Sequence, residues 1–125
     1  MKIEKLLVVD DDEDIRTVTR LTASRVGHWK VAVAASGPEA LEAAERERPD
    51  VILLDVMMPD MDGPTTLARL REQPCSAETP VIFLTAKAQK HEVSQLRSLG
   101  AAGVIRKPFE PAALPDQIRR IVAEL

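Results

Sequence analysis

The sequence predicts an α/β fold in which five parallel strands alternate with five helices. Five short apolar runs of strand length recur along the 125 residues, each followed by a helical pattern or its loop. The runs are continuous rather than alternating, as expected for parallel strands that bury both faces under helices. The strands are expected at residues 6–9, 31–35, 51–54, 81–84 and 103–105.

The composition predicts one compact domain over residues 1–125, because 45% of the residues are hydrophobic and 30% are charged. No stretch approaches the roughly 20 apolar residues of a membrane span. The apolar run 6–9 stops at acidic residues, unlike the long apolar region of a signal peptide, so a cytoplasmic location is expected. The net charge of −3 argues against direct nucleic-acid binding. The single cysteine, Cys75, cannot form an internal disulfide.

Helix boundaries are marked by capping residues and proline. Residues 36–39 (Ser-Gly-Pro-Glu) form a capping-box pattern, which predicts a helix over about 38–46. The acids at 12–14 are expected to cap the first helix, where its positive end favours negative charge. Pro115 predicts an offset start or slight kink in the last helix. The apolar stripe of that helix consists of Leu114, Ile118, Ile121, Val122 and Leu125.

Polar side chains end four of the five predicted strands. Asp10 and Asp11 end the first strand, Asp55 the third, Thr85 the fourth and Lys107 the fifth. Each alone has an ordinary structural explanation, as a helix cap, a strand residue or a solvated lysine. Ligands of open parallel sheets bind beyond the carboxyl ends of the strands, so we expect these five side chains to meet at one edge.

Three carboxylates at one edge indicate a divalent cation, because Asp10, Asp11 and Asp55 would otherwise repel one another. With oxygen ligands only and neither cysteine nor histidine nearby, Mg²⁺ is the expected ion, and Mn²⁺ is an acceptable substitute. An aspartate carboxylate can act as a nucleophile and form an acyl phosphate. Lys107 and the Thr85 hydroxyl could then stabilise the phosphoryl oxygens.

The strings LLVVDDDEDIR, LLDVMMPDMDG, VIFLTAK and IRKPF resemble the receiver (CheY-like) domains of two-component response regulators. The match covers essentially the whole chain in the right order. The resemblance implies a flavodoxin-like sheet of order 2-1-3-4-5 and phosphorylation of Asp55 by a histidine kinase or a phosphotransfer protein. It implies a signalling phosphoacceptor that catalyses only its own phosphotransfer and autodephosphorylation, and not an enzyme.

The resemblance also implies the ligands of the metal ion. Asp11 would bind Mg²⁺ directly and Asp10 mainly through water. The Asp55 carboxylate and the backbone carbonyl of Met57 would complete the protein ligands.

Further residues take their expected roles from the same resemblance. Lys107 would pair with the phosphoryl group, and Thr85 would move to bond it. The peptide bond before Pro108 is expected to be cis. Pro59 and Gly63 would shape the loop behind the nucleophile.

Val104 departs from the family pattern, because many receivers carry a Tyr or Phe there that swings inward on activation. Either a valine rotamer change and a loop shift transmit the signal, or the domain mainly relays phosphate. Lys87 and Met57 occupy sites that in the family influence access to the acyl phosphate. The resemblance implies that the face of helix 4, strand 5 and helix 5, including Val104 and Arg106, contacts a downstream protein or output domain. A phosphorylation-dependent dimer is compatible with it.

Three other classes of protein share parts of this residue pattern. A pseudo-receiver would bind partners without phosphorylation, although intact Asp10 and the other site residues argue against this. Asp10 and Asp12 resemble the D-x-D start of haloacid-dehalogenase phosphatases, but Asp14 stands where that family has Thr or Val. A calcium loop fails, because Ile15 and Leu21 replace its turn glycine and its bidentate glutamate.

Overall fold

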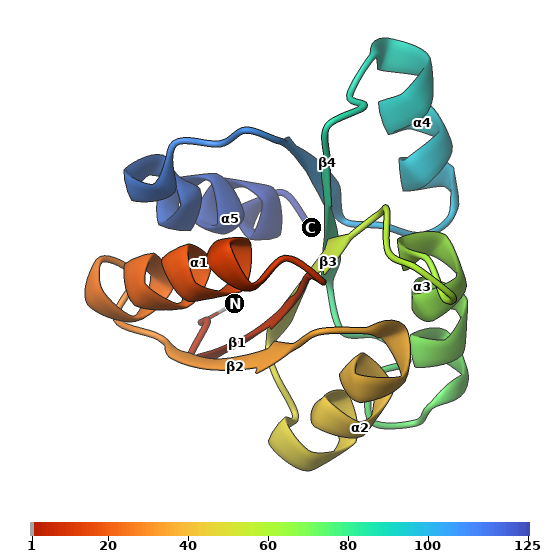
Figure 1. The fold of residues 1–125 in the computed structure, drawn as a ribbon, viewed down its shortest axis with the longest axis horizontal. Coiled ribbons are helices and arrows are strands. Elements are labelled where there is room, and N and C mark those ends of the chain that lie inside the picture. The colour runs from red at the N-terminus through yellow and green to blue at the C-terminus, as the bar shows by residue number, and fades with distance from the viewer. Residues whose placement is uncertain (1) are drawn as a thin grey trace.

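The computed structural model describes residues 2–125 and contains a five-stranded parallel sheet (Figure 1). The strands pair in the order β2-β1-β3-β4-β5, which confirms both the fold class and the predicted order. Each predicted run lies in a strand or overlaps one. The strands are β1 (Lys5–Val9), β2 (Lys30–Ala34), β3 (Val51–Asp55), β4 (Val81–Thr85) and β5 (Gly103–Arg106).

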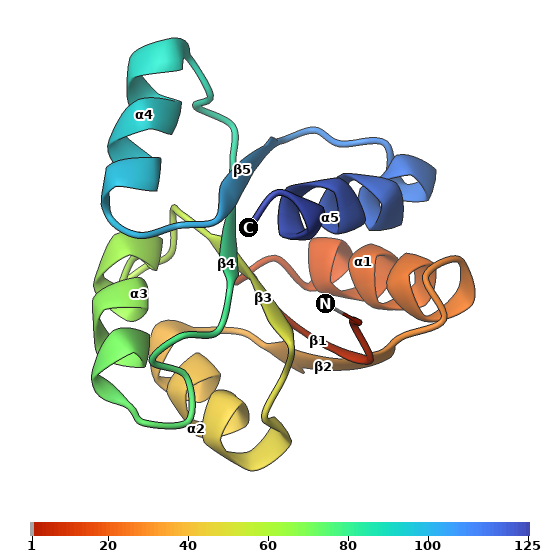
Figure 2. The same ribbon diagram turned by 180° about the vertical axis from the view of Figure 1, so that it is seen from behind.

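Helices cover both faces of the sheet, with α1 and α5 on one side and α2, α3 and α4 on the other (Figures 1 and 2). A short 3₁₀ helix, Pro111–Ala113, precedes α5. None of the helices in residues 2–125 is long and apolar enough to cross a membrane. The helices are α1 (Glu13–Arg25), α2 (Gly37–Glu47), α3 (Gly63–Glu72), α4 (Lys90–Ser98) and α5 (Leu114–Ala123).

Two hydrophobic cores explain why the strand runs are continuous. In β4, Phe83 packs into the core beneath α2, α3 and α4, while its neighbours Ile82 and Leu84 pack into the core beneath α1 and α5. All three side chains are fully buried. Successive strand residues point to opposite faces, so a strand covered on both sides needs an apolar residue at every position.

Helix starts follow the predicted capping residues. The Asp12 carboxylate accepts hydrogen bonds from the first-turn amides of α1, as expected for the acids at 12–14. Ser36 accepts from the Glu39 amide, which is one half of the predicted capping box. The Glu39 carboxylate accepts from the Ala35 amide instead of the Ser36 amide, so the reciprocal half of the box is displaced by one residue. The helix α2 extends one residue beyond the prediction at each end. Pro115 lies in the first turn of α5, and the preceding 3₁₀ turn provides the expected offset start.

Trp29 is a packing residue beside β2. The residue is 7% exposed and belongs to the core beneath α1 and α5. The guanidinium of Arg119, from α5, lies 4.9 Å from the ring centroid and donates a hydrogen bond to the Gly27 carbonyl at 3.1 Å. These contacts attach α5 to the loop between α1 and β2.

The contact between α2 and the loop before α3 depends on a glycine. A Cβ atom at Gly37 would lie 2.6 Å from the Met61 sulfur and 2.6 Å from the Thr66 hydroxyl. Such distances are shorter than ordinary van der Waals contact, so Gly37 permits this close approach.

Candidate functional site

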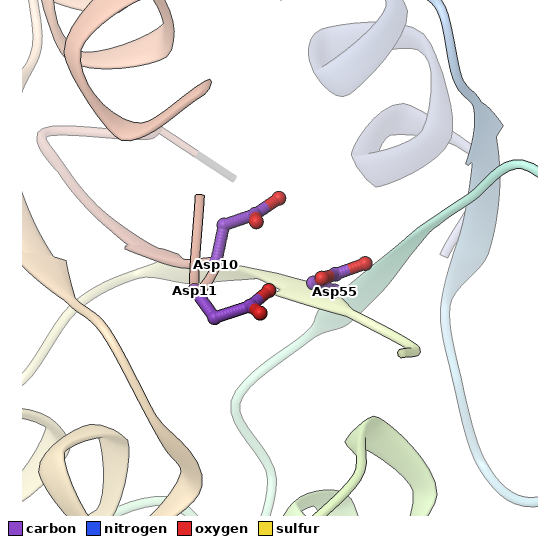
Figure 3. A group of neighbouring side chains, drawn as sticks. All are labelled: Asp10, Asp11 and Asp55. Carbon is purple, nitrogen blue, oxygen red and sulfur yellow. The ribbon is translucent and has the colours of Figure 1, made fainter. Parts of the chain in front are cut away.

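Three acidic side chains meet at the carboxyl edge of β1 and β3, which are neighbours in the sheet (Figure 3). Asp55 is the last residue of β3, and Asp10 and Asp11 directly follow β1. One carboxylate oxygen from each lies within 4.8 Å of the others. Asp10 and Asp55 are buried, whereas Asp11 is exposed. The predicted acids therefore form one cluster that is open to solvent on the side of Asp11.

Lys107 brings a positive charge to this cluster from the end of β5. Its ammonium group donates to Asp10 Oδ2 at 2.7 Å and to Asp55 Oδ1 at 3.2 Å. The peptide bond between Lys107 and Pro108 is cis. The other oxygen of Asp10 accepts from the Asp12 amide at 2.9 Å, which fixes the Asp10 carboxylate from both sides.

Burial and neighbouring charge perturb the titration of Asp55. Desolvation, followed by the charge of Asp10, raises the pKa of Asp55 from 3.8 to about 6, although Lys107 opposes the rise. Burial alone lowers the pKa of Lys107, but the hydrogen bond and charge of Asp10, together with Asp55, raise it above its ordinary value. The lysine therefore stays charged, but its single positive charge does not balance the negative charge of the carboxylates.

The chemistry of the cluster fits a hard divalent cation. Its ligand atoms are all carboxylate oxygens, the donors that Mg²⁺ and Mn²⁺ prefer. Three carboxylates and one ammonium carry a formal charge of −2, which one divalent ion would neutralise. Met57 lies in the turn after β3, and its side chain is exposed at the rim of the site. Asp10, Asp11 and Asp55 could thus hold such an ion.

Thr85 ends β4 and is buried at the same edge of the sheet. Its hydroxyl accepts a hydrogen bond from the Lys87 amide at 3.0 Å and donates to the Lys87 carbonyl at 3.3 Å. Within residues 2–125, these are the hydrogen bonds of the hydroxyl. The Lys87 side chain is exposed. A contact between Thr85 and a group on Asp55 would therefore require the hydroxyl to leave the Lys87 carbonyl.

The loop behind Asp55 passes very close to the end of β3. The Gly63 amide donates to the Val56 carbonyl at 2.9 Å. A Cβ atom at Gly63 would lie 2.5 Å from the Asp55 carbonyl oxygen, so only glycine allows the loop to return here. Pro59 is exposed in the same loop.

Two arginines near the site make hydrogen bonds that the sequence did not predict. Arg16, on α1, donates to the backbone carbonyl of Asp10 at 2.9 Å. Arg106, on β5, donates to the Ala88 carbonyl at 3.2 Å. Both acceptors are backbone atoms, so no residue type in the sequence marks the pairing. Val104, two residues before Arg106, is half-buried against the core beneath α2, α3 and α4.

An apolar groove of about 380 Å³ lies beside Lys107. Its walls come from the start of α1, the residue after Thr85, and the segment that follows β5. The lining residues include Ile15, Val18, Pro108 and Phe109. The groove therefore adjoins the acidic cluster through Lys107.

The chain is similar to proteins of known family in both sequence and structure. It is 39% identical over 119 residues to the alkaline phosphatase synthesis transcriptional regulatory protein PhoP of Bacillus subtilis, covering 95% of this chain and 48% of that protein. The chain thus spans about half the length of this curated relative. The chemotaxis protein CheY4 of Vibrio cholerae has a TM-score of 0.88 at 35% identity, covering 96% of this chain and 99% of that one.

A beryllofluoride-activated receiver domain, DrrB, also has this fold, with a TM-score of 0.81 at 29% identity over 98% of this chain and 99% of that one. Residues 6–119 match the response regulator receiver domain. Proteins of this family act in signalling rather than as enzymes, and the acidic cluster with Lys107 is the kind of site that they carry. The chain therefore belongs to the response regulator receiver domain family of two-component signalling.

Proposed function

We propose that Asp55 accepts a phosphoryl group from a histidine kinase or a histidine phosphotransfer protein. The observation that carries this proposal is the meeting of Asp55 with Asp10 and Asp11, all within 4.8 Å, under the ammonium of Lys107. A buried carboxylate is suited to attack phosphorus as a nucleophile. The cation beside it can then stabilise the negative charge of the phosphoryl oxygens.

In the proposed transfer, an Asp55 carboxylate oxygen forms a bond to phosphorus as the phosphorus–nitrogen bond of the donor phosphohistidine breaks. The bonding electron pair returns to the imidazole nitrogen. With a pKa of about 6, Asp55 is mostly ionised and nucleophilic at neutral pH. A Mg²⁺ ion, held by Asp10, Asp11, Asp55 and the Met57 backbone carbonyl, would supply positive charge to the carboxylates and the phosphoryl oxygens.

Lys107 and Thr85 then act on the product. The Lys107 ammonium, which already donates to Asp55, pairs with one phosphoryl oxygen. The Thr85 hydroxyl leaves the Lys87 carbonyl and donates to another phosphoryl oxygen. The resulting shift of the face formed by α4, β5 and α5, where Val104 and Arg106 lie, controls a downstream protein or output domain. The greater length of the relatives supports such an output.

The apolar groove beside Lys107 supports the approach of a protein donor. A phosphohistidine must come close to Asp55, so the donor surface has to cover the rim of the site. Ile15, Val18 and Phe109 offer that surface apolar contact area next to the acids.

The test is intact mass after incubation with acetyl phosphate, with and without Mg²⁺, on the wild type, Asp55→Asn and Asp60→Asn. Asp60 is an exposed acid of the following loop and serves as the matched control. We expect a Mg²⁺-dependent gain of one phosphoryl group in the wild type and Asp60→Asn, and none in Asp55→Asn. The absence of an adduct in the wild type would favour a phosphorylation-independent interaction module.

A further inference from the structure

The segment between β4 and α4, residues 86–89, is held by hydrogen bonds from both of its neighbours. On one side, Thr85 both accepts from the Lys87 amide and donates to the Lys87 carbonyl. On the other side, Arg106 donates to the Ala88 carbonyl at 3.2 Å. These bonds keep the segment bent back over the end of β4.

The bent segment occupies the Thr85 hydroxyl. A hydroxyl has one proton to donate, and here that proton is directed at the Lys87 carbonyl. As long as residues 86–89 keep this conformation, Thr85 cannot donate to an acceptor attached to Asp55. Rearrangement of the segment therefore has to accompany any donation from Thr85 into the site.

Arg106 is the side chain that ties this segment to β5. It lies opposite Thr85 in the β4–β5 register, and the next residue is Lys107, which bonds Asp55. The helix α4 that follows the segment has one buried residue within 90–98, Leu96. Figures 1 and 2 show α4 projecting beyond the rest of the fold. With so little packing from α4, the segment depends on its hydrogen bonds, and the one from Arg106 is the bond that ties it to β5.

We propose that Arg106 makes an autoinhibitory contact: its hydrogen bond to the Ala88 carbonyl holds residues 86–89 in the conformation that keeps the Thr85 hydroxyl on Lys87. Arg106 is a positioning residue, which acts on Thr85 through the backbone of the segment. The inference rests on the proposed phosphoacceptor function. The contact has to break when a phosphoryl group on Asp55 recruits Thr85, so it lowers the apparent affinity of the site for that group.

The test compares the wild type with Arg106→Ala, Arg106→Lys and Arg97→Ala. Arg97 is an exposed arginine in the last turn of α4, away from the segment, and controls for the loss of one positive charge from this part of the chain. The probe is beryllofluoride with saturating Mg²⁺, a mimic of the phosphoryl group, and its apparent affinity is measured by titration calorimetry. We expect binding about five-fold tighter in Arg106→Ala, the equivalent of one exposed hydrogen bond from a charged donor. Arg106→Lys is expected to lie between, and Arg97→Ala to match the wild type.

Hydrogen exchange without ligand supplies a second measurement, which a loss of global stability alone would not reproduce. We expect faster exchange at residues 86–89 in Arg106→Ala, with the strands unchanged. Equal or weaker beryllofluoride binding by Arg106→Ala, in a wild type that binds, would overturn this inference and leave the phosphoacceptor function intact. Failure of both proteins to bind would instead overturn the phosphoacceptor function, and this inference with it.

Discussion

Replacing Asp55 by asparagine removes the charge of a buried carboxylate while keeping its shape. The carboxylate lies beside Asp10 in the part of the sheet edge that Lys107 covers. We expect Asp55→Asn to be more stable than the wild type at neutral pH in the absence of divalent metal, because ionised Asp55 is poorly solvated and repelled by Asp10.

The size of the effect follows from the pKa of Asp55, which rises from 3.8 to about 6. One pKa unit corresponds to ~1.4 kcal/mol, so ionisation at pH 7 costs the folded state about 3 kcal/mol. The folded-state pKa of this group is raised, so its contribution to stability is present in full below pH 4 and is lost as the pH rises through about 6. Asparagine has no such dependence.

Urea unfolding in EDTA at several pH values between 4 and 8 measures this difference. The free energy of unfolding of Asp55→Asn is expected to exceed that of the wild type by about 3 kcal/mol at pH 7, and the gap is expected to close towards pH 4. Mg²⁺ is expected to narrow the gap at pH 7 by binding the folded wild type. Asp60→Asn is the control for a general loss of negative charge. A variant no more stable than the wild type at pH 7 in EDTA would refute this explanation.

Three further substitutions are tested by urea unfolding. The free energy of unfolding of Gly37→Ala is expected to be lower than that of the wild type by about 1 to 3 kcal/mol, because the added methyl group would overlap Met61. An unchanged urea midpoint would mean that the loop containing Met61 moves aside without cost. Ser36→Ala is expected to lower the free energy of unfolding by about 1 kcal/mol, since the first turn of α2 loses its cap. Ser36→Thr keeps a capping hydroxyl and should retain most of the wild-type stability. Arg119→Ala is expected to lose about 1 kcal/mol and to change the fluorescence of Trp29, the single tryptophan; an unaltered emission spectrum would contradict the stacking.

The fold and the location of the site were predictable because they depend on local patterns. The continuous apolar runs required a sheet buried on both faces, and the polar residues that end four of the five runs were thereby directed to one edge. Capping was equally local: Ser36 and Asp12 perform the predicted roles with amides two or three residues away. The strand order, by contrast, came from the resemblance to receivers, since the apolar pattern does not specify which strands are neighbours.

Side-chain contacts to backbone carbonyls were beyond prediction from the sequence. Arg16 and Arg106 bond the carbonyls of Asp10 and Ala88, and every residue offers such an acceptor. The engagement of Thr85 with its own chain two residues later was missed for the same reason. Likewise, a sequence shows that Lys107 can pair with an acid, but not that its shorter bond is to Asp10 rather than to Asp55.

The bond between Lys107 and Asp10 joins residues 97 positions apart and links the ends of the first and last strands. During synthesis, Asp55 leaves the ribosome long before Lys107 does. A partial chain that had already paired β1 with β3 would gather the acids without their lysine. On the proposed function, the phosphoryl site is therefore complete only after the last strand has joined the sheet, and a chain ending before residue 107 is expected to be a poorer phosphoryl acceptor than the finished protein.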